Sequence, residues 1–200
     1  MKFDSPLIKG TFKKRYKRFF ADIEIDGEIV TAHVPNTGSL KSVLSDDIPC
    51  YVTHSDDPKR KLKYTLQMLK PGTSWVGINT QLPNKLVREA FDNKKVKHWS
   101  KYKFARNEVK IHDKTRVDLV LGNHAILRDA KKISSIKELE ATEEKFHFVE
   151  IKNVTLKSEE FAQFPDAVST RAQKHIEELA GLTKLGHSAE FVFVLSLIHI

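Results

Sequence analysis

Residues 19–34 carry the pattern that most constrains the fold of this chain. Positions 19, 21, 23 and 25 are apolar and alternate with mostly polar neighbours, which is the two-residue period of a strand. Asp26-Gly27 is a strong hairpin-turn signal, and residues 28–34 supply the return strand. Further short strands are predicted at 50–53, 62–69 and 75–80. Five short strands joined by tight turns predict a small β-barrel of the oligonucleotide-binding (OB) type or of a generic type.

The second half of the chain changes to a mixed pattern of helices and strands. The predicted order is α-β-β-β-α-β, with helices near 85–91 and 170–185 and strands at 102–111, 116–121, 146–156 and 190–198. In the later helix, the expected buried stripe is Ala172, Ile176, Leu179 and Thr183. Residues 123–145 form a polar, partly helical excursion. We therefore predict a barrel in residues 1–80 and an α/β or α+β domain in residues 81–200.

Composition limits the classes of function. The chain has 200 residues and a formal net charge of +8, and its pI of about 9.4 suits a polyanionic partner or simply a basic surface. The single cysteine, Cys50, excludes an intramolecular disulfide and favours a reducing compartment. No run approaches the ~18 apolar residues of a membrane span, and no apolar signal core opens the sequence. A cytoplasmic protein is the expectation.

Two predicted strands contain charged residues within apolar runs. Along 146–154, successive side chains point to opposite faces, so Glu150 and Lys152 share one face. Along 116–121, Asp118 is the acidic residue in an otherwise apolar stretch, beside Arg116. Buried charges are destabilising unless they are paired or bound to a metal. If the two strands are neighbours, Asp118 and Glu150 can converge.

Two converging carboxylates make a suitable site for Mg²⁺ or Mn²⁺, which prefer hard oxygen ligands. Such a metal would activate water and stabilise charge on a phosphate, while Lys152 would position or deprotonate the water or offset the developing charge. The alternative is a buried Glu–Lys or Asp–Arg pair that only fixes strand register. Glu108 and Glu89 could each add a carboxylate, or could be solvated surface charges.

The later helix presents polar residues that could hold phosphates near this site. Arg171, Lys174 and His175 lie on one polar face. Thr170 with Gln173 fits a capping box, which is the structural explanation for both residues.

The barrel half contains two basic clusters. Arg15, Tyr16, Lys17 and Arg18 interleave charge with a ring, and Lys59, Arg60 and Lys61 follow later. Charges for phosphates and rings for base stacking are what a single-strand or backbone-tracking surface needs. A strand with a solvated basic face explains them equally well. The loop at 33–39, which includes Asn36, could form an anion-binding nest or a plain turn.

Several blocks in order resemble the sugar fermentation stimulation protein A family. They are RYKRFFADI (15–23), HVPNTGS (33–39), WVGINT (75–80), PNKLVREAF (83–91), TRVDLVL (115–121), FVEIKNVTL (148–156) and FPDAVSTRAQKHIEEL (164–179). The resemblance implies an N-terminal OB-type barrel and a C-terminal PD-(D/E)xK nuclease-like domain. It also implies DNA binding without strong sequence preference.

The same resemblance assigns the metal site to Asp118, Glu150 and Lys152. It places Arg116, Gln173 and Lys174 in the family's other polar blocks. Three functions remain open: a metal-dependent DNA nuclease, a non-catalytic DNA-binding regulator of sugar metabolism genes, and an RNA-binding or RNA-processing protein. The sequence departs from the family in a longer 123–145 segment, in Ala172, and in a C-terminus expected to be truncated or altered.

Overall fold

The computed structural model describes residues 2–112, 115–129, 133, 135–158, 161–165 and 170–196, without the side chains of Ser158 and Arg171. The chain forms two compact units. The first comprises Met1–Leu82, Asn153–Val168 and Leu195–Ile200, and the second comprises Pro83–Lys152 and Ser169–Val194. The change of pattern near residue 80 therefore lies close to the first crossing between units, and two later segments return to the first unit.

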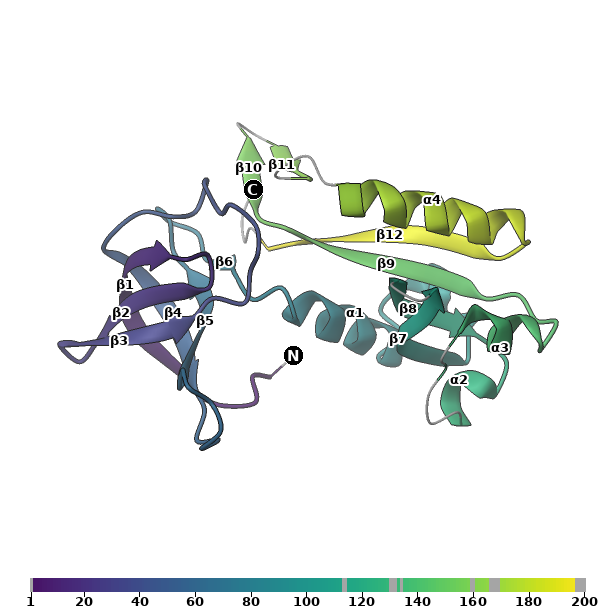
Figure 1. The fold of residues 1–200 in the computed structure, drawn as a ribbon, viewed down its shortest axis with the longest axis horizontal. Helices are drawn as coiled ribbons and strands as arrows, with labels where there is room; N and C mark the ends of the chain where they lie inside the picture. Colours follow the sequence, from purple (N-terminus) through teal and green to yellow (C-terminus); the bar gives the residue numbers. More distant parts are fainter. Residues whose placement is uncertain are drawn as a thin grey trace. The chain divides into compact units, whose positions relative to one another are not determined.

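The first unit is a barrel built from β1 (Leu7–Tyr16), β2 (Phe20–Ile25), β3 (Glu28–His33), β4 (Ile48–His54) and β5 (Tyr64–Leu69), shown in Figure 1. The strand order is β3-β2-β1-β4-β5, followed by the short β6 (Val76–Gly77). A parallel pairing of Ala32 with Tyr64 and of His33 with Thr65 joins β3 to β5 and closes the barrel. This closed five-stranded barrel confirms the predicted OB-type architecture.

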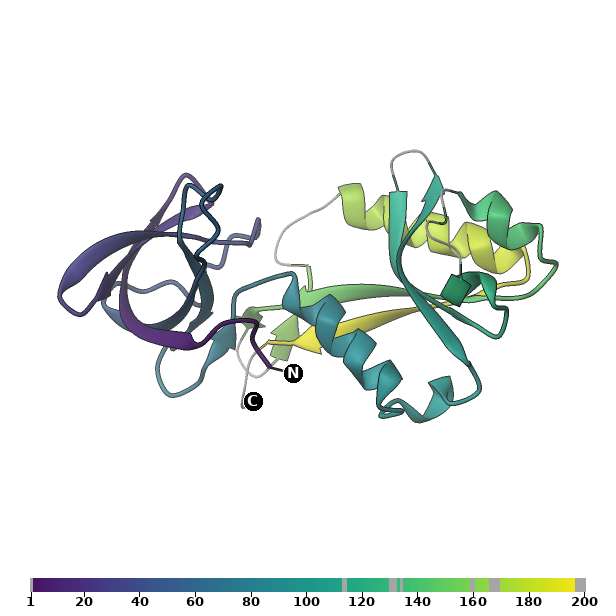
Figure 2. The same cartoon turned by 90° about the horizontal axis from the view of Figure 1, so that it is seen from below.

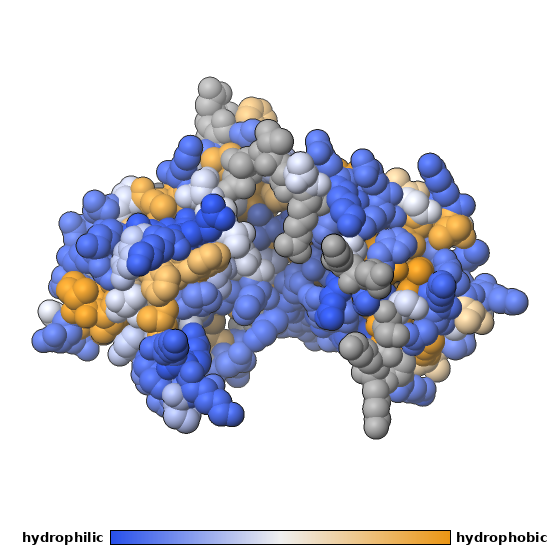
Figure 3. All heavy atoms as spheres, in the orientation of Figure 1, coloured by the Kyte–Doolittle hydropathy of each residue, from blue (hydrophilic) through white to orange (hydrophobic). Residues whose placement is uncertain are grey.

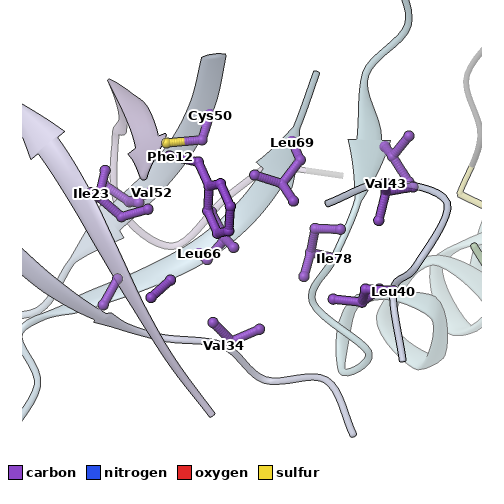
Figure 4. Close-up of a cluster of buried hydrophobic side chains, with 13 residues drawn as sticks. Phe12, Ile23, Val34, Leu40, Val43, Cys50, Val52, Leu66, Leu69 and Ile78 are labelled. Atoms are coloured by element: carbon purple, nitrogen blue, oxygen red, sulfur yellow. The ribbon is translucent and has the colours of Figure 1, made fainter. Parts of the chain in front are cut away.

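The interior of the barrel explains the alternation seen in the sequence. Inward-facing residues from every strand, together with Leu40 and Val43 from the β3–β4 connection, form one apolar cluster (Figure 4). Phe12 and Leu66 are almost fully enclosed in it. Cys50 also lies there, and burial raises the pKa of its thiol to about 12, so this cysteine is an apolar filler.

Two strand predictions for the barrel need correction. β1 was not predicted as a strand, because its inward alternation is masked by charged residues and only Phe12 is fully buried. The strand predicted at 75–80 is shorter: its ladder with β5 covers Val76 and Gly77, followed by one hydrogen bond from Ile78 N to Gln67 O at 2.8 Å. Beyond it, the chain turns at Asn79, whose Oδ1 accepts a hydrogen bond from Gln81 N at 3.0 Å.

The second unit contains a four-stranded mixed sheet in the order β12-β9-β8-β7. Its strands are β7 (Phe104–His112), β8 (Thr115–Gly122), β9 (His147–Val154) and β12 (Ser188–Leu195). β7–β8 and β8–β9 are antiparallel. β9 and β12 run in the same direction, since Ser188 N donates to Phe146 O and Ser196 N donates to Val154 O, both at 3.0 Å.

Helices cover the two faces of this sheet. Val120, Phe146 and Phe148 pack with residues of α2 (Ile126–Asp129), α3 (Ile136–Glu140) and α4 (Thr170–Lys184). Leu119, Leu121, Val149 and Ile151 pack with residues of α1 (Leu82–Asp92) and of the 3₁₀ turn η1 (Lys97–Trp99). The observed order confirms the predicted mixed α/β class and the predicted opposite-facing alternation along β9.

The β7–β8 hairpin bends out of the plane of β9 and β12 toward α4, as Figure 2 shows. Within this hairpin, Glu108 has a φ of 56°, in the left-handed region that a side chain adopts at some cost. At the end of the hairpin, Thr115 Oγ1 donates to Glu178 Oε1 of α4 at 2.7 Å. The hairpin therefore spans from the sheet to the helix that covers it.

The buried stripe of α4 differs from the predicted one. His175, Leu179 and Leu182 are buried, whereas Ile176 is 54% exposed and Thr183 is exposed. These buried positions follow the helical i, i+4, i+7 spacing, so α4 is rotated to place a histidine on the sheet. The reason is a polar contact of His175 with Glu150, which the apolar pattern does not contain.

β10 (Leu156–Ser158) and β11 (Phe161–Gln163) form a small antiparallel hairpin in the first unit. The face in Figure 3 is mostly hydrophilic, with apolar residues in small separate groups. Among the described residues, no helix is long and apolar enough to cross a membrane.

Candidate functional site

β8 and β9 bring Asp118 and Glu150 to the same level of the second unit's sheet. The ladder pairs Leu121 with His147, Val120 with Phe148 and Leu119 with Val149. The same register continued by one step sets Asp118 opposite Glu150. At this step the side chain of Asp118 takes the place of a backbone acceptor, because its Oδ2 accepts a hydrogen bond from Ile151 N at 2.7 Å.

Asp118 lies in an environment that disfavours its negative charge. Burial raises the pKa of this carboxyl, and the negative charge of Glu150 raises it further. Hydrogen bonds from Ile151 N and Asn84, together with the charge of Lys152, lower the pKa without reversing the shift. Asn84, in the first turn of α1, donates from Nδ2 to Asp118 Oδ1 at 3.0 Å. A cation beside Asp118 would relieve this unfavourable charge.

Glu150 is the most enclosed charge of the site, at 2% exposure. Lys152 Nζ lies 2.5 Å from its Oε1, and His175 Nδ1 of α4 lies 2.5 Å from the same oxygen. Lys152 follows Glu150 by two residues on one strand, so the strand period brings them together as the sequence predicts. The predicted nuclease constellation and the predicted buried ion pair thus occupy the same residues.

Glu108 supplies a further carboxylate on the other side of Asp118. Asn107 pairs with Leu119 and Val109 with Val117, so Glu108 lies opposite Asp118 across β7 and β8. Its Oε1 is 3.4 Å from Asn84 Nδ2, the same amide that holds Asp118. Glu108 is exposed, and its backbone φ of 56° is in the left-handed region.

The donor set suits a hard divalent cation. Asp118 and Glu150 offer carboxylate oxygens, with Glu108 on the neighbouring strand, and such oxygens are the ligands of Mg²⁺, Mn²⁺ and Ca²⁺. Within the described residues, no group of three or more His, Cys, Asp or Glu side chains could hold a metal ion on its own. A cation here would therefore take its other ligands from water or from substrate oxygens, as Mg²⁺ commonly does.

The other predicted residues of this unit lie at varying distances from the centre. Arg116 is exposed and pairs with Lys110 across the hairpin. Gln173 and Lys174 are exposed, and Lys174 Nζ is 3.6 Å from Glu178 Oε1. The side chain of Arg171 lies outside the described residues. The structure adds Asn84 to the site and shows that His175 contacts Glu150. The sequence signal for Asn84 was a polar amide directly after Pro83 at a helix start.

The two basic clusters of the barrel meet at one end of the first unit. Phe20 of β2 pairs with His33 of β3, and His33 pairs with Thr65 of β5. The β1–β2 turn and the β4–β5 connection therefore adjoin the same end. Arg60 Nη2 donates to Thr65 Oγ1 at 2.8 Å. Burial, and secondarily the charge of Arg60, lowers the pKa of His33.

Within the first cluster, the side chains have different roles. The Arg15 guanidinium donates to Asn36 O at 2.7 Å and Gly38 O at 2.9 Å and so holds the 36–39 loop. Tyr16 stacks on Phe20 with ring centroids 5.7 Å apart. Lys17 and Arg18 are exposed in a turn with left-handed φ values of 45° and 64°.

The second cluster and the 33–39 loop divide in the same way. Lys59 and Lys61 are exposed. Asn36 is 5% exposed, donates to Ile78 O at 2.9 Å and accepts from Gly38 N at 2.8 Å. Arg15 and Asn36 are therefore engaged in building the barrel, whereas Lys17, Arg18, Lys59 and Lys61 face solvent.

The geometry defines a class of protein with an OB barrel and a mixed α/β sheet that carries a buried carboxylate–lysine–histidine centre. Family models identify this class. Residues 14–78 match the SfsA N-terminal OB domain, and residues 81–200 match the Sugar fermentation stimulation protein RE domain. The chain belongs to the sugar fermentation stimulation protein (SfsA) family.

Individual relatives agree with this assignment. The chain is 49% identical to a Sugar fermentation stimulation protein homolog of Bdellovibrio bacteriovorus over 98% of this chain and 77% of the relative. A homolog from Geotalea uraniireducens is 43% identical over 97% of this chain and 76% of the relative. The fold is similar to that of Pyrococcus furiosus SfsA in complex with Ca²⁺, with a TM-score of 0.79 and 24% identity over 100% of this chain and 77% of that one.

Proposed function

We propose that the chain binds DNA with low sequence specificity and hydrolyses phosphodiester bonds with a divalent metal at Asp118, Glu150 and Lys152. The observation that carries the proposal is the convergence of Asp118 and Glu150 from adjacent strands, with Lys152 on Glu150 at 2.5 Å. This arrangement realises the D…ExK pattern of the PD-(D/E)xK nucleases, which the sequence resembles. The expected metal is Mg²⁺ or Mn²⁺.

Each residue has a distinct task in this proposal. Asp118 and Glu150 would hold the metal, which supplies Lewis-acid activation of water and of the phosphate. Lys152 brings a positive charge to the same place, where it orients the attacking water and offsets negative charge as it develops. Asn84 and His175 are positioning residues, since each contacts one of the two carboxylates.

A related protein supports the metal part of the proposal. The solved Pyrococcus furiosus SfsA is in complex with Ca²⁺, and Ca²⁺ shares with Mg²⁺ and Mn²⁺ a preference for oxygen ligands. The raised pKa of Asp118 supports it independently, because a buried carboxylate beside another carboxylate is stabilised by a bound cation.

The basic end of the barrel supports DNA binding. In OB barrels, the face of the second and third strands and the loops between strands 1–2 and 4–5 bind oligonucleotides. Here those two loops carry Lys17, Arg18, Lys59 and Lys61, beside the rings of Phe19 and Phe20. The opposite end of β2 carries Glu24, which is ion-paired with Lys13 at 2.8 Å, and the turn after it carries the acidic Asp26. We infer that the polyanion contacts the loop end.

One observation favours a second candidate, a non-catalytic DNA-binding regulator. Glu150 is contacted by Lys152 and His175 at 2.5 Å each, so its charge is compensated within the protein. A site of this kind could remain a buried polar network that stabilises the fold. DNA binding by the barrel would then be the whole function.

Plasmid nicking separates the two candidates. Wild type with Mg²⁺ or Mn²⁺ should nick supercoiled DNA, and Asp118→Asn and Lys152→Ala should each lose at least about 100-fold in rate. Asp129→Asn removes an exposed carboxylate of the same unit, paired with Arg128, and should retain full activity. Equal cleavage by wild type and the two site variants would refute the assigned site. Binding without any cleavage would favour the regulator, and competition by RNA would test nucleic-acid preference.

A further inference from the structure

A cavity of about 160 Å³ adjoins the C-terminal end of α1 in the second unit. Pockets for drug-sized ligands measure ~300–1,000 Å³, so this one suits a single small group. Phe91, Val96 and Tyr102 contribute half-buried apolar surface to its lining, and the enclosed indole of Trp99 also lines it. Such walls suit an apolar ring better than a free phosphate.

The charges around the cavity are unbalanced in favour of lysine. Lys94 and Lys103 line it and are exposed, and neither is paired with an acid among the described residues. Asp92, the acid in the lining, accepts a hydrogen bond from Arg88 Nε at 3.0 Å on each oxygen, so its charge is already compensated. A concave surface of one sign of charge concentrates ions of the opposite sign. The cavity therefore favours an anionic ligand that also carries an apolar ring.

The segment that supplies these residues carries more lysines than the end of a helix explains. Residues 93–103 read NKKVKHWSKYK, with five lysines and no acid. The dipole of α1 favours positive charge at its C-terminal end, which accounts for Lys94 and Lys95. It does not account for Lys97 or Lys103, which lie beyond the helix and are exposed. A bound polyanion would relieve the repulsion among these charges.

The cavity is separate from the acidic centre, although α1 connects the two. Asn84 in the first turn of α1 donates to Asp118 Oδ1 at 3.0 Å, and Phe91 in the last turn lines the cavity. The helix rises about 1.5 Å per residue, so Asn84 and Phe91 are about 10 Å apart along its axis. A ligand in the cavity would therefore leave the acidic centre free.

We propose that the cavity binds one unpaired nucleotide of a nucleic-acid strand, with the base against the apolar walls and the flanking phosphates at Lys94 and Lys103. That the ligand is nucleic acid rests on the proposed function. A nucleotide carries both an apolar ring and phosphate charge, and proteins hold single strands with aromatic side chains and cations together. The base must be unpaired, because a base inside a duplex is stacked and cannot enter a pocket. The site anchors a strand away from the bond that is cleaved.

Binding of a short oligodeoxythymidylate in EDTA tests the charged part of the site without cleavage. Lys94→Gln combined with Lys103→Gln should lower the slope of log K against log salt by about 1.4, at about 0.7 for each lost phosphate contact with a single strand. Lys137→Gln combined with Lys184→Gln is the matched control. It removes two exposed lysines from α3 and α4, which cover the other face of the sheet, and should change the slope by much less. Equal slope changes in the two double variants would overturn the proposal.

Ser100, which also lines the cavity and is exposed, tests the part of the site that holds the base. Ser100→Leu fills the cavity while every lysine stays, and it should weaken binding at least about fivefold, the lower value for one lost base contact. Ser100→Ala loses the same hydrogen bond from Ser100 Oγ to Lys97 O but fills no space, so it should bind like wild type. If Ser100→Leu also binds like wild type, charge alone attracts the strand and the cavity is not the site.

The amide resonances of Val96 and Tyr102, both in the lining, locate the ligand directly. Oligodeoxythymidylate should shift both resonances, whereas inorganic phosphate at the same concentration should not. Equal shifts with phosphate would indicate an anion site and overturn the assignment of a nucleotide. Shifts with the oligonucleotide in a protein that nicks no DNA would refute the proposed hydrolysis and leave this site standing. Nicking that depends on Asp118, without such shifts, would refute this site and leave the hydrolysis standing.

Discussion

The two regions that carry the proposed function arrange their charges in opposite ways. At the loop end of the barrel, Lys17, Arg18, Lys59 and Lys61 are exposed to solvent. In the second unit, Glu150 is 2% exposed and contacted by Lys152 and His175 at 2.5 Å. Exposed charges can attract a polyanion of any sequence. Enclosed charges have fixed positions, which is what the hydrolysis of a single phosphodiester bond would require. In the proposed function, the exposed charges of the barrel serve binding and the enclosed charges of the second unit serve the chemistry.

The largest expected effect tests whether the two regions are energetically separate. Phe12→Ala in the barrel and Phe148→Ala in the sheet each empty an almost fully enclosed position and should lower the free energy of unfolding by about 3–5 kcal/mol. The chain has two tryptophans, Trp75 in the first unit and Trp99 in the second. Urea unfolding of single-tryptophan variants can therefore follow each unit.

Each alanine variant should shift mainly the transition reported by the tryptophan of its own unit. If either variant shifts both transitions equally, the two units unfold as one and the proposed separation fails.

A smaller effect is expected from divalent metal. A ligand at 100 times its Kd stabilises the folded state by about 2.7 kcal/mol, so Mg²⁺ or Ca²⁺ should raise the midpoint followed by Trp99. Asp118→Asn should largely abolish this shift because it removes a carboxylate charge from the site. The Trp75 signal provides an internal control. Equal stabilisation of wild type and Asp118→Asn would place the metal elsewhere.

Two double variants that each remove two positive charges, but from different positions, test the DNA-binding role of the barrel. Lys17→Gln with Arg18→Gln should reduce the salt slope of DNA binding by about 1.8, at 0.9 for each lost phosphate contact. Lys13→Gln with Lys14→Gln should change it far less, because Lys13 contacts Glu24 and Asp47 and Lys14 lies 3.6 Å from Asp22. A larger effect of the second pair would move the interface away from the loop end.

The smallest expected effect concerns pH. The folded-state pKa of Asp118 is raised above the ordinary value of 3.8, so the folded protein binds this proton more tightly than the unfolded chain does. Without metal, wild type should lose stability relative to Asp118→Asn as pH rises from below 3.8 through the raised pKa. The difference should then stay constant at higher pH. Urea unfolding of both proteins at several pH values measures it, and wild-type stability that rises relative to Asp118→Asn over this pH range would contradict the charge environment described for Asp118.

The sequence was sufficient for the local features that one strand or turn encodes. Glu150 and Lys152 share a face because they are two residues apart, and Asp118 attracted attention because it interrupts an apolar run. The barrel hairpin at Asp26-Gly27 follows from the same kind of signal. These patterns depend on near neighbours in the chain, which a single sequence displays directly.

Features that depend on distant partners were not predicted. Asn84 reaches Asp118 across 34 positions, and His175 reaches Glu150 across 25, so neither contact leaves a periodic trace. The contact between His175 and Glu150 explains the rotation of α4, and this rotation leaves Ile176 outside the buried stripe that was predicted to include it. β1 was missed for a related reason, since its charged residues pair with acids on neighbouring segments. Likewise, Arg15 was predicted to bind phosphate, but in the structure its guanidinium donates to the carbonyl oxygens of Asn36 and Gly38.

The hydrogen bond from Ile151 N to Asp118 Oδ2 has a consequence for which substitutions this position can tolerate. Asp118 substitutes for a backbone carbonyl where the β8–β9 ladder ends, and it also supplies a carboxylate to the candidate site. Asparagine retains an acceptor of the same reach, whereas alanine leaves an amide of a central strand without its partner. In a library of all residues at position 118, selection for folded protein should keep both aspartate and asparagine. Selection for turnover should keep aspartate alone.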